Sequence, residues 1–186
     1  KEQPPKNFPK PLKPEQMGEK SVAGFYAAIG YMIASLEYFT GANDPEPLLQ
    51  VAADNQGNKI SPDNFRQVVE QRKSQKTWAE DLMLVAILDS PQPKIDGDTY
   101  TWNGKIKASN GSFFVINGQV TDIPEDKQEE ESPAIFKGTY KGGTWLLQDP
   151  SAAGQSGGAQ DQQQTPQQQA PQEGAGEGTS GNGGAQ

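Results

Sequence analysis

The chain has 186 residues, of which 32% are hydrophobic and 22% are charged, with 21 Gly and 15 Pro. The formal net charge of −8 argues against nucleic acid as a partner, because phosphate binding needs clustered Lys and Arg. Cys and His are both absent, which excludes thiolate nucleophiles, thiolate or imidazole zinc sites and Ser-His-Asp triads. We therefore expect a globular domain with disordered flanks and with no enzymatic activity, cofactor or metal.

The two ends of the chain have compositions that do not favour folding. Residues 1–18 hold five prolines, which deny helix and sheet hydrogen bonds, and are predicted to form an extended spacer. Residues 150–186 contain no aromatic, Leu, Ile, Val or Met and are predicted to be a disordered tail rich in Gln, Gly and Pro. The globular domain is expected at residues 19–149. Because the chain starts with Lys and has no run of about 18 apolar residues, neither an intact signal peptide nor a membrane span is expected.

The first predicted element is a long amphipathic helix. Apolar residues recur at spacings of three and four from Val22 to Phe39, after an N-cap candidate at Ser21 and before a stop at Gly41. Gly24 and Gly30 lower helix propensity, so we expect another segment to pack closely against that side of the helix.

Two further helices are predicted before the strands begin. Asp44-Pro45 has the pattern of an N-cap followed by proline at the first helical position, and predicts a short helix through Ala52. Ser61-Pro62 repeats this pattern and predicts a third helix to about Lys73.

The second half of the domain is predicted to form antiparallel strands. Leu82–Leu88 is a continuous apolar run, which is typical of a strand covered on both faces. Asn110-Gly111 is a strong hairpin signal, expected to join a strand at 99–106 to a strand that starts at Ser112.

The strand that starts at Ser112 is expected to continue to residue 123 through a bulge at Asn117-Gly118. After a solvated acidic loop at 125–131, residues 134–140 and 144–147 are predicted to form a hairpin. The turn of this hairpin is Lys141-Gly142-Gly143.

About three helices followed by four to five antiparallel strands predict an α+β fold, with the helices packed on a curved, cone-like sheet. This order resembles the nuclear-transport-factor-two-like or cystatin-like superfold, which is an analogy of fold alone. An incompletely filled cone would leave an apolar pocket edged by tyrosine hydroxyls, whereas a filled one would use the same aromatic side chains as core. The candidate pocket residues are Tyr26, Tyr38, Trp102 and Trp145.

The acidic residues offer weaker alternatives. Asp96 and Asp98 could hold a hard cation, but Asp-Gly-Asp before a strand is ordinary turn chemistry, so no metal site is predicted. A carboxylate-based hydrolase or isomerase would need an acid with a raised pKa inside the pocket. The acids on predicted strands, all near strand ends, are Glu80, Asp81 and Asp122.

A pattern in the first half of the chain is similar to an actinobacterial lipoprotein family of unknown function. The matching positions are Pro14-Glu15, Lys20-Ser21, Gly24-Phe25, Tyr31, Leu36, Tyr38, Thr40-Gly41 and Leu48-Leu49. The resemblance implies a proline-rich spacer, a small α+β domain and a lipid-bearing Cys upstream of Lys1. Asn55 and Asn58 stand where family members carry a Cys-x-x-Cys-like pair, so no disulfide is expected there.

This resemblance implies a function for the domain. It would be a non-catalytic, extracytoplasmic interaction or accessory module, displayed on the bacterial cell surface by a lipid anchor. We expect it to be a monomer whose partner is an envelope protein or a cell-wall component. The alternative function is a binder of a small molecule or peptide in the cone pocket, followed by the hydrolase or isomerase.

Overall fold

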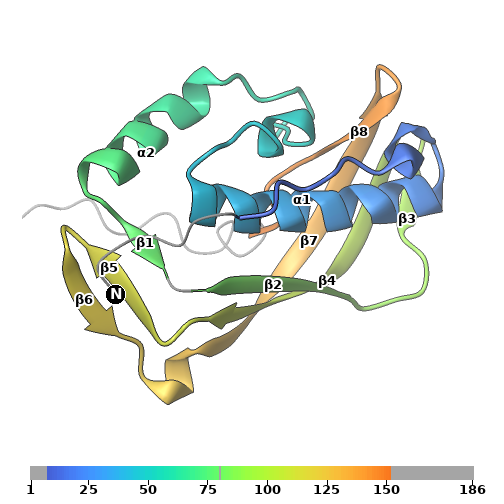
Figure 1. The fold of residues 1–186 in the computed structure, drawn as a ribbon. Coiled ribbons are helices and arrows are strands. Elements are labelled where there is room, and N and C mark those ends of the chain that lie inside the picture. The colour runs from blue at the N-terminus through green and yellow to red at the C-terminus, as the bar shows by residue number, and fades with distance from the viewer. Residues whose placement is uncertain (1–7, 80, 152–186) are drawn as a thin grey trace, which may run out of the picture.

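The computed structural model describes residues 8–79 and 81–151, which form an α+β domain with two antiparallel sheets (Figure 1). The α-helices are α1 (Val22–Ala42) and α2 (Asp63–Ser74), and the 3-10 helices are η1 (Glu15–Gly18), η2 (Leu48–Gln50) and η3 (Glu125–Lys127). The larger sheet has the order β2 (Leu82–Leu88), β4 (Thr99–Asn110), β7 (Glu129–Lys141) and β8 (Thr144–Leu147), and β3 (Lys94–Asp96) also pairs with β4. The smaller sheet has the order β1 (Trp78–Ala79), β5 (Phe113–Ile116) and β6 (Gln119–Asp122). The α+β class with a curled antiparallel sheet is confirmed.

Helix α1 lies across one face of the larger sheet, as Figure 1 shows. Its predicted start is confirmed, because the Ser21 hydroxyl accepts a hydrogen bond from the Gly24 amide at 3.0 Å. The helix runs past Gly41 to Ala42, and its C-cap Asn43 adopts the left-handed conformation with a φ of 55°.

The two glycines of α1 have different surroundings. A Cβ at Gly24 would overlap the carbonyl oxygens of Glu19 and Gln16, so the predicted close packing is confirmed at this position. At Gly30 the prediction is wrong for the part of the chain that the structure describes, because a Cβ there would meet none of its atoms within 4 Å. Gly30 therefore faces open space.

Helix α1 is also long and apolar enough, by length and composition alone, to cross a membrane. Core helices pass the same test, and α1 buries one face in the domain core. Length and composition alone are therefore not evidence that α1 crosses a membrane. The expectation that the chain has no membrane span stays a prediction.

The predicted second helix is wrong, and the described residues hold two α-helices rather than three. Between Asp44 and Ala53 the chain forms only η2, and the backbone that follows η2 pairs with β8 instead. The Leu147 amide donates to the Val51 carbonyl, and the Ala53 amide donates to the Leu147 carbonyl, both at 2.7 Å. The predicted third helix corresponds to α2.

Helix α2 fixes the C-terminal end of α1. Arg72 donates to the Thr40 carbonyl at 2.6 Å, and Asn43 donates to the Val69 carbonyl at 3.1 Å. Burial lowers the pKa of the Arg72 guanidinium. These contacts hold the end of α1 against the rest of the domain.

A tight loop follows η2 and is organised by Asp54. The Asp54 carboxylate accepts hydrogen bonds from the amides of Asn58 at 2.8 Å and Gln56 at 2.9 Å. These bonds lower the pKa of the Asp54 carboxyl, and the bond from the Asn58 amide has the largest effect. Gly57 adopts a φ of 78°, which favours glycine and completes the loop.

The low pKa of Asp54 predicts part of the acid sensitivity of the domain. A carboxyl whose pKa is lower in the folded state stabilises fully above its unfolded pKa of about 4, and this stability is lost as the pH falls through the folded pKa. Asp54→Asn should therefore make unfolding midpoints in urea less sensitive to pH below about 4. Asp126→Asn removes an exposed carboxylate elsewhere and serves as the control. An unchanged pH profile in Asp54→Asn would contradict this prediction.

The domain core is an aromatic cluster between α1 and the larger sheet. The Phe25 ring lies 5.7 Å from Tyr100, 6.2 Å from Trp102 and 5.0 Å from Trp145, measured between ring centroids. Met17 is fully buried in the same core, although it lies in the segment predicted to be an extended spacer. The packed part of the chain thus begins before residue 19. Of the predicted tail, residues 152–186 lie outside the described residues.

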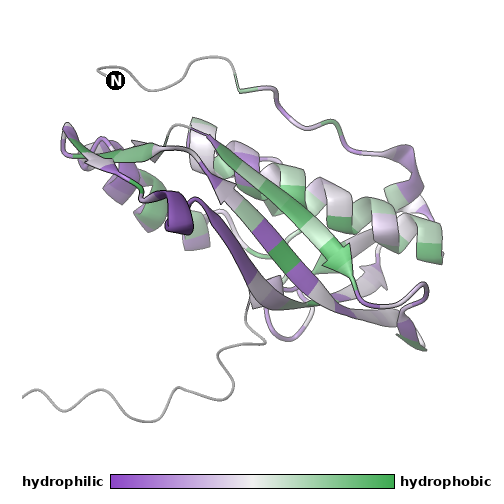
Figure 2. Cartoon of the chain, turned by 90° about the horizontal axis from the view of Figure 1, so that it is seen from below, coloured by the Kyte–Doolittle hydropathy of each residue, from purple (hydrophilic) through white to green (hydrophobic). Residues whose placement is uncertain are grey.

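Strand β2 is confirmed as an element, but the prediction that both of its faces are covered is wrong. Its inward side chains pack against the core, whereas Met83, Val85 and Ile87 are 59%, 46% and 40% exposed. The reason is that α1 covers only one face of the sheet. Figure 2 shows β2 as a green, hydrophobic strand beside β4, on which hydrophilic and hydrophobic residues alternate.

The prediction of a hairpin at Asn110-Gly111 is also wrong. Asn110 is the last residue of β4 and pairs with Leu82, and the chain then crosses to the smaller sheet. The two-residue turn forms instead at Asn117 and Gly118, where a bulge was predicted. Both residues have positive φ there, 54° and 79°, as a type I′ turn between β5 and β6 requires.

The last hairpin is confirmed, with β7 and β8 joined by Gly142 and Gly143 at φ values of 61° and 78°. Strand β7 is longer than predicted and takes in part of the expected acidic loop, where Lys107 and Glu129 form an ion pair at 2.9 Å. The hydrogen bond to Glu129 and the negative charge of Glu129 raise the pKa of Lys107.

Candidate functional site

The four predicted pocket residues lie in two different environments. Trp145 is fully buried and donates to the Glu19 carbonyl at 2.8 Å, and Trp102 is buried and donates to the Ser90 carbonyl at 2.8 Å. Tyr26 is 61% exposed and Tyr38 is half-buried. The tryptophans thus belong to the core, whereas the tyrosines line two cavities along the outside of α1.

The first cavity is a groove of about 320 Å³ between α1 and the edge strand β2. We call it the α1–β2 groove. Helix α1 lines it with a stripe at helical spacing that includes Tyr26, Gly30, Ala34 and Glu37. Strand β2 lines it with Leu84, Ala86 and Leu88.

Small side chains on α1 keep this groove open. Gly30 and Ala34 are four residues apart, so they lie one above the other on the helix surface. The open space beside Gly30 is part of the groove. Sequence reasoning singled out Gly30 but predicted the opposite, a closely packed neighbour.

In the described part of the chain, no strand pairs with the edge of β2 that faces the groove. The Asp89 amide donates to the Asn103 carbonyl at 3.0 Å, and the Gly111 amide donates to the Asp81 carbonyl at 2.6 Å. Odd-numbered residues of this segment therefore turn their backbone groups toward β4. Since backbone direction alternates along an edge strand, the even-numbered residues of β2 turn theirs toward the open edge.

One of these edge amides is already occupied. The Leu84 amide donates to the Glu37 carboxylate at 2.5 Å. Within the described part of the chain, no hydrogen bond reaches the amide of Ala86, the next residue that faces the edge.

A second cavity, of about 390 Å³, continues along the C-terminal half of α1. It shares Ala34 and Glu37 with the groove, and its wall includes Phe8 and Tyr38. The Phe8 ring lies directly on Gly41, where a Cβ would overlap it. The N-terminal segment therefore forms one wall of this cavity.

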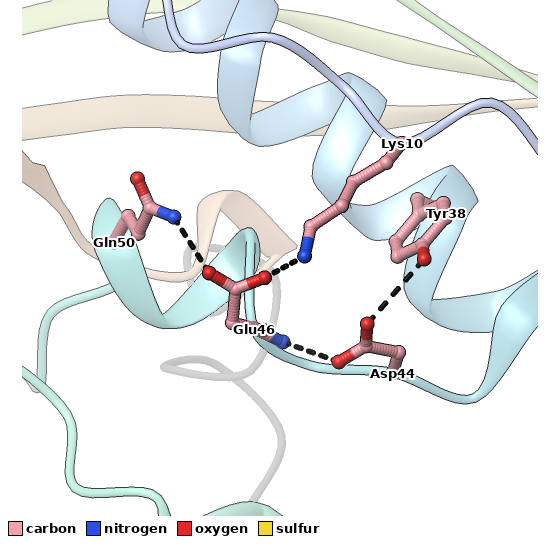
Figure 3. Close-up of polar contacts among 5 residues, drawn as sticks. All are labelled: Lys10, Tyr38, Asp44, Glu46 and Gln50. Carbon is pink, nitrogen blue, oxygen red and sulfur yellow. Dashed lines mark hydrogen bonds and ion pairs between the residues drawn. The ribbon is translucent and has the colours of Figure 1, made fainter.

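A polar cluster holds that segment in place (Figure 3). Lys10 forms an ion pair with Glu46, which also accepts a hydrogen bond from Gln50 at 3.1 Å. The Glu46 amide donates to Asp44 at 3.0 Å, and the Tyr38 hydroxyl donates to the same carboxylate at 3.4 Å. Burial, and then the charge of Asp44, raise the pKa of Tyr38.

The two cavities are acidic at the point where they meet. Glu37 lines both of them and Asp81 lines the second, and none of the described residues in either lining is Lys or Arg. Neither carboxylate has an ion-pair partner among the residues that the structure describes. Sequence reasoning did not single out Glu37, although an acid within an apolar helical stretch was a usable signal.

The other acids give no site. Asp98 forms an ion pair with Lys20, and its hydrogen bond and charge raise the pKa of Lys20. Asp96 ends β3 opposite Thr99, which confirms the turn between them. Glu80 lies outside the described residues, and Asp122 is exposed on β6. Across 8–79 and 81–151, no group of three acids, Cys or His could hold a metal ion.

The groove lies in a segment that is shared with other proteins. A family match covers residues 1–151, which include all of α1 and β2. The chain belongs to DUF6318, a family of unknown function. No curated protein matches this DUF6318 chain.

Several solved structures resemble the DUF6318 domain weakly. AclR from Streptomyces galilaeus aligns with a TM-score of 0.36 and 13% identity, over 69% of this chain and 88% of AclR. The intermembrane space region of chloroplast ARC6 aligns with a TM-score of 0.41 and 8% identity, over 69% of this chain and 93% of the ARC6 chain. TsrD from Streptomyces laurentii aligns with a TM-score of 0.31 and 15% identity, over 66% of this chain and 84% of TsrD. At these scores and identities, no functional argument follows.

Proposed function

We propose that this domain is a non-catalytic binding module whose ligand lies in the α1–β2 groove. The observation that carries this proposal is the apolar groove itself, which is open beside Gly30 and bordered by an unpaired strand edge. Concave apolar surfaces with a few placed polar groups are typical of ligand sites. The groove takes the place of the cone pocket, whose tryptophans are core residues.

The proposal includes a cellular setting. In this proposal the domain is an extracytoplasmic interaction or accessory module of an actinobacterial cell surface. A lipid anchor holds it there, and its partner is an envelope protein or a cell-wall component. The support is the sequence resemblance and the proline-rich segment before the domain. A nuclear-transport-factor-two-like or cystatin-like fold is part of the same proposal. Mass spectrometry of the protein from its native membrane, seeking a lipidated N-terminal Cys, tests the anchor.

Gly30→Leu is the variant that tests the groove. The Cβ of a leucine at this position has no described neighbour within 4 Å, so the rest of the side chain should extend into the groove and fill part of it. Thermal-shift screening of lipids, glycopeptides, small aromatics and peptides should identify ligands, since binding to the folded state raises the melting temperature. Their affinities should fall about tenfold or more in Gly30→Leu, because the variant fills the space that they occupy.

Ala23→Leu is the matched control, because it adds the same side chain at an exposed position of α1 outside both cavities. It should bind as the unmodified domain does. Equal binding by Gly30→Leu and Ala23→Leu would place the ligand elsewhere and overturn the proposal.

A carboxylate-based hydrolase or isomerase is the less favoured function. It needs an acid held in a closed pocket, whereas the groove is open along the strand edge and Glu37 is occupied by the Leu84 amide.

A further inference from the structure

We propose that the ligand of the α1–β2 groove is an extended polypeptide that adds to β2 as an extra strand and carries a Lys or Arg. This inference rests on the proposed function, and names its class of partner. Three observations carry it: the backbone of the edge, the side chains on both faces of β2, and the charge at one end of the groove.

The backbone argument starts from the alternation along β2. Leu84, Ala86 and Leu88 turn their amides and carbonyls away from β4, and the Ala86 amide has no hydrogen bond within the described part of the chain. An unpaired sheet edge is a template for another strand, and β-strand addition is a recurring way of binding peptides. A small apolar molecule would leave these donors and acceptors unused, whereas a peptide backbone matches their spacing.

The side-chain argument uses both faces of β2. An added strand would direct alternate side chains into the α1–β2 groove, where Gly30 and Ala34 leave room. Its other side chains would lie beside the row of Met83, Val85 and Ile87 on the outer face. Cross-strand apolar pairs of this kind stabilise sheets, so an added strand would use the exposed row as well as the groove.

The charge argument concerns Glu37. Its carboxylate binds the Leu84 amide, so an added strand can pair with β2 from Leu84 toward Leu88 but ends at this carboxylate. Asp81 lines the adjoining cavity, and the lining residues that the structure describes offer no positive charge to either acid. A Lys or Arg at that end of the peptide would complement the two carboxylates.

A second copy of the chain fits this edge less well. Strand β2 contains no Lys or Arg, so a second β2 would bring no positive charge to Glu37 and Asp81 and would add its own Glu37 and Asp81 to the interface. Like charges at an interface oppose association. The basic, extended peptide is therefore the occupant that the groove favours.

A displayed library of random octapeptides is the probe. Selection on the full chain should yield peptides with apolar runs and at least one Lys or Arg, and these peptides should bind Gly30→Leu more weakly. Each selected peptide is then made with N-methyl groups on either its odd or its even backbone amides. One set should lose at least about tenfold in affinity, and the other should bind almost as before, because only alternate amides of an added strand face β2.

Two variants of the protein complete the experiment. Ala86→Pro removes the free edge amide without removing a bond to β4, and should weaken binding at least about tenfold. Glu37→Gln keeps an acceptor for the Leu84 amide but removes the charge. It should lower the affinity for Lys-containing peptides about fivefold and the affinity for their norleucine analogues less than about twofold. The N-methyl test uses the unmodified protein, so it decides even if Ala86→Pro does not fold.

The outcomes separate this inference from the proposed function. Peptides that require Gly30 but tolerate both N-methyl sets would overturn strand addition and leave the groove as the binding site. Peptides that bind Gly30→Leu as tightly as the unmodified protein would show that the groove is not their binding site and would overturn the proposed function. Self-association through β2, seen as a doubled mass by sedimentation that Ala86→Pro abolishes, would overturn the peptide in favour of a second copy. A selection that yields no peptide would also overturn the inference.

Discussion

Replacing Trp145 with alanine is expected to lower the free energy of unfolding by about 3 to 5 kcal/mol. The indole is fully buried, and its ring centroid lies 5.0 Å from Phe25, 4.6 Å from Tyr100 and 5.4 Å from Tyr140. The substitution would leave a cavity among these rings and would also leave the Glu19 carbonyl without its indole donor. Domains of this size are typically stable by only about 5 to 15 kcal/mol, so the loss should be large in a urea titration.

Two variants give this measurement its scale. Trp145→Phe keeps an aromatic ring but not the N–H donor, so its loss should be smaller than that of Trp145→Ala. Tyr26→Ala removes an aromatic side chain that is 61% exposed, and its effect should stay within about 0.5 kcal/mol. If Trp145→Ala cost less than about 1 kcal/mol, the aromatic cluster would not be the main core of the domain.

Some elements were predictable because local chemistry decides them. The apolar period from Val22 to Phe39 and the hydroxyl of Ser21 determine α1, and Gly142 with Gly143 determines the last hairpin. Each of these signals acts within a few residues, so no distant contact can easily reverse it.

Other elements depended on contacts that a sequence pattern does not contain. The two Asn-Gly pairs are alike in sequence, but only Asn117-Gly118 adopts the positive φ values of a turn. At Asn110, pairing with Leu82 keeps the residue in β4. In the same way, the pairing of Val51 and Ala53 with β8 overrides the helix signal at Asp44-Pro45.

The candidate site was only partly predictable for a related reason. An apolar run such as Leu82–Leu88 is consistent with a strand covered on both faces or with an edge strand that binds a partner. The number of layers over a sheet is a property of the whole fold. Gly30 was recognised as unusual, but a glycine marks a close neighbour and an empty groove equally well in sequence. Only the space around its Cα separates these two readings.

Alanine substitutions at the two glycines of α1 should therefore change stability in opposite directions. Helix propensity alone predicts that both Gly24→Ala and Gly30→Ala stabilise the domain by up to about 1 kcal/mol. At Gly30 this gain should be realised, because the new methyl group has no neighbour within 4 Å among the residues that the structure describes. At Gly24 the methyl group would lie 2.7 Å from the Gln16 carbonyl oxygen and 3.0 Å from the Trp145 indole nitrogen.

These neighbours of Gly24 cannot easily move. The Gln16 carbonyl belongs to the backbone of η1, and the indole is fixed in the core by its bond to Glu19. Overpacking of this kind costs about 1 to 3 kcal/mol, which exceeds the propensity gain, so Gly24→Ala should destabilise the domain. Urea unfolding of the two single variants and the double variant measures both signs. A stabilising Gly24→Ala would mean that η1 does not pack against α1, and Met17 would then lose its place in the core.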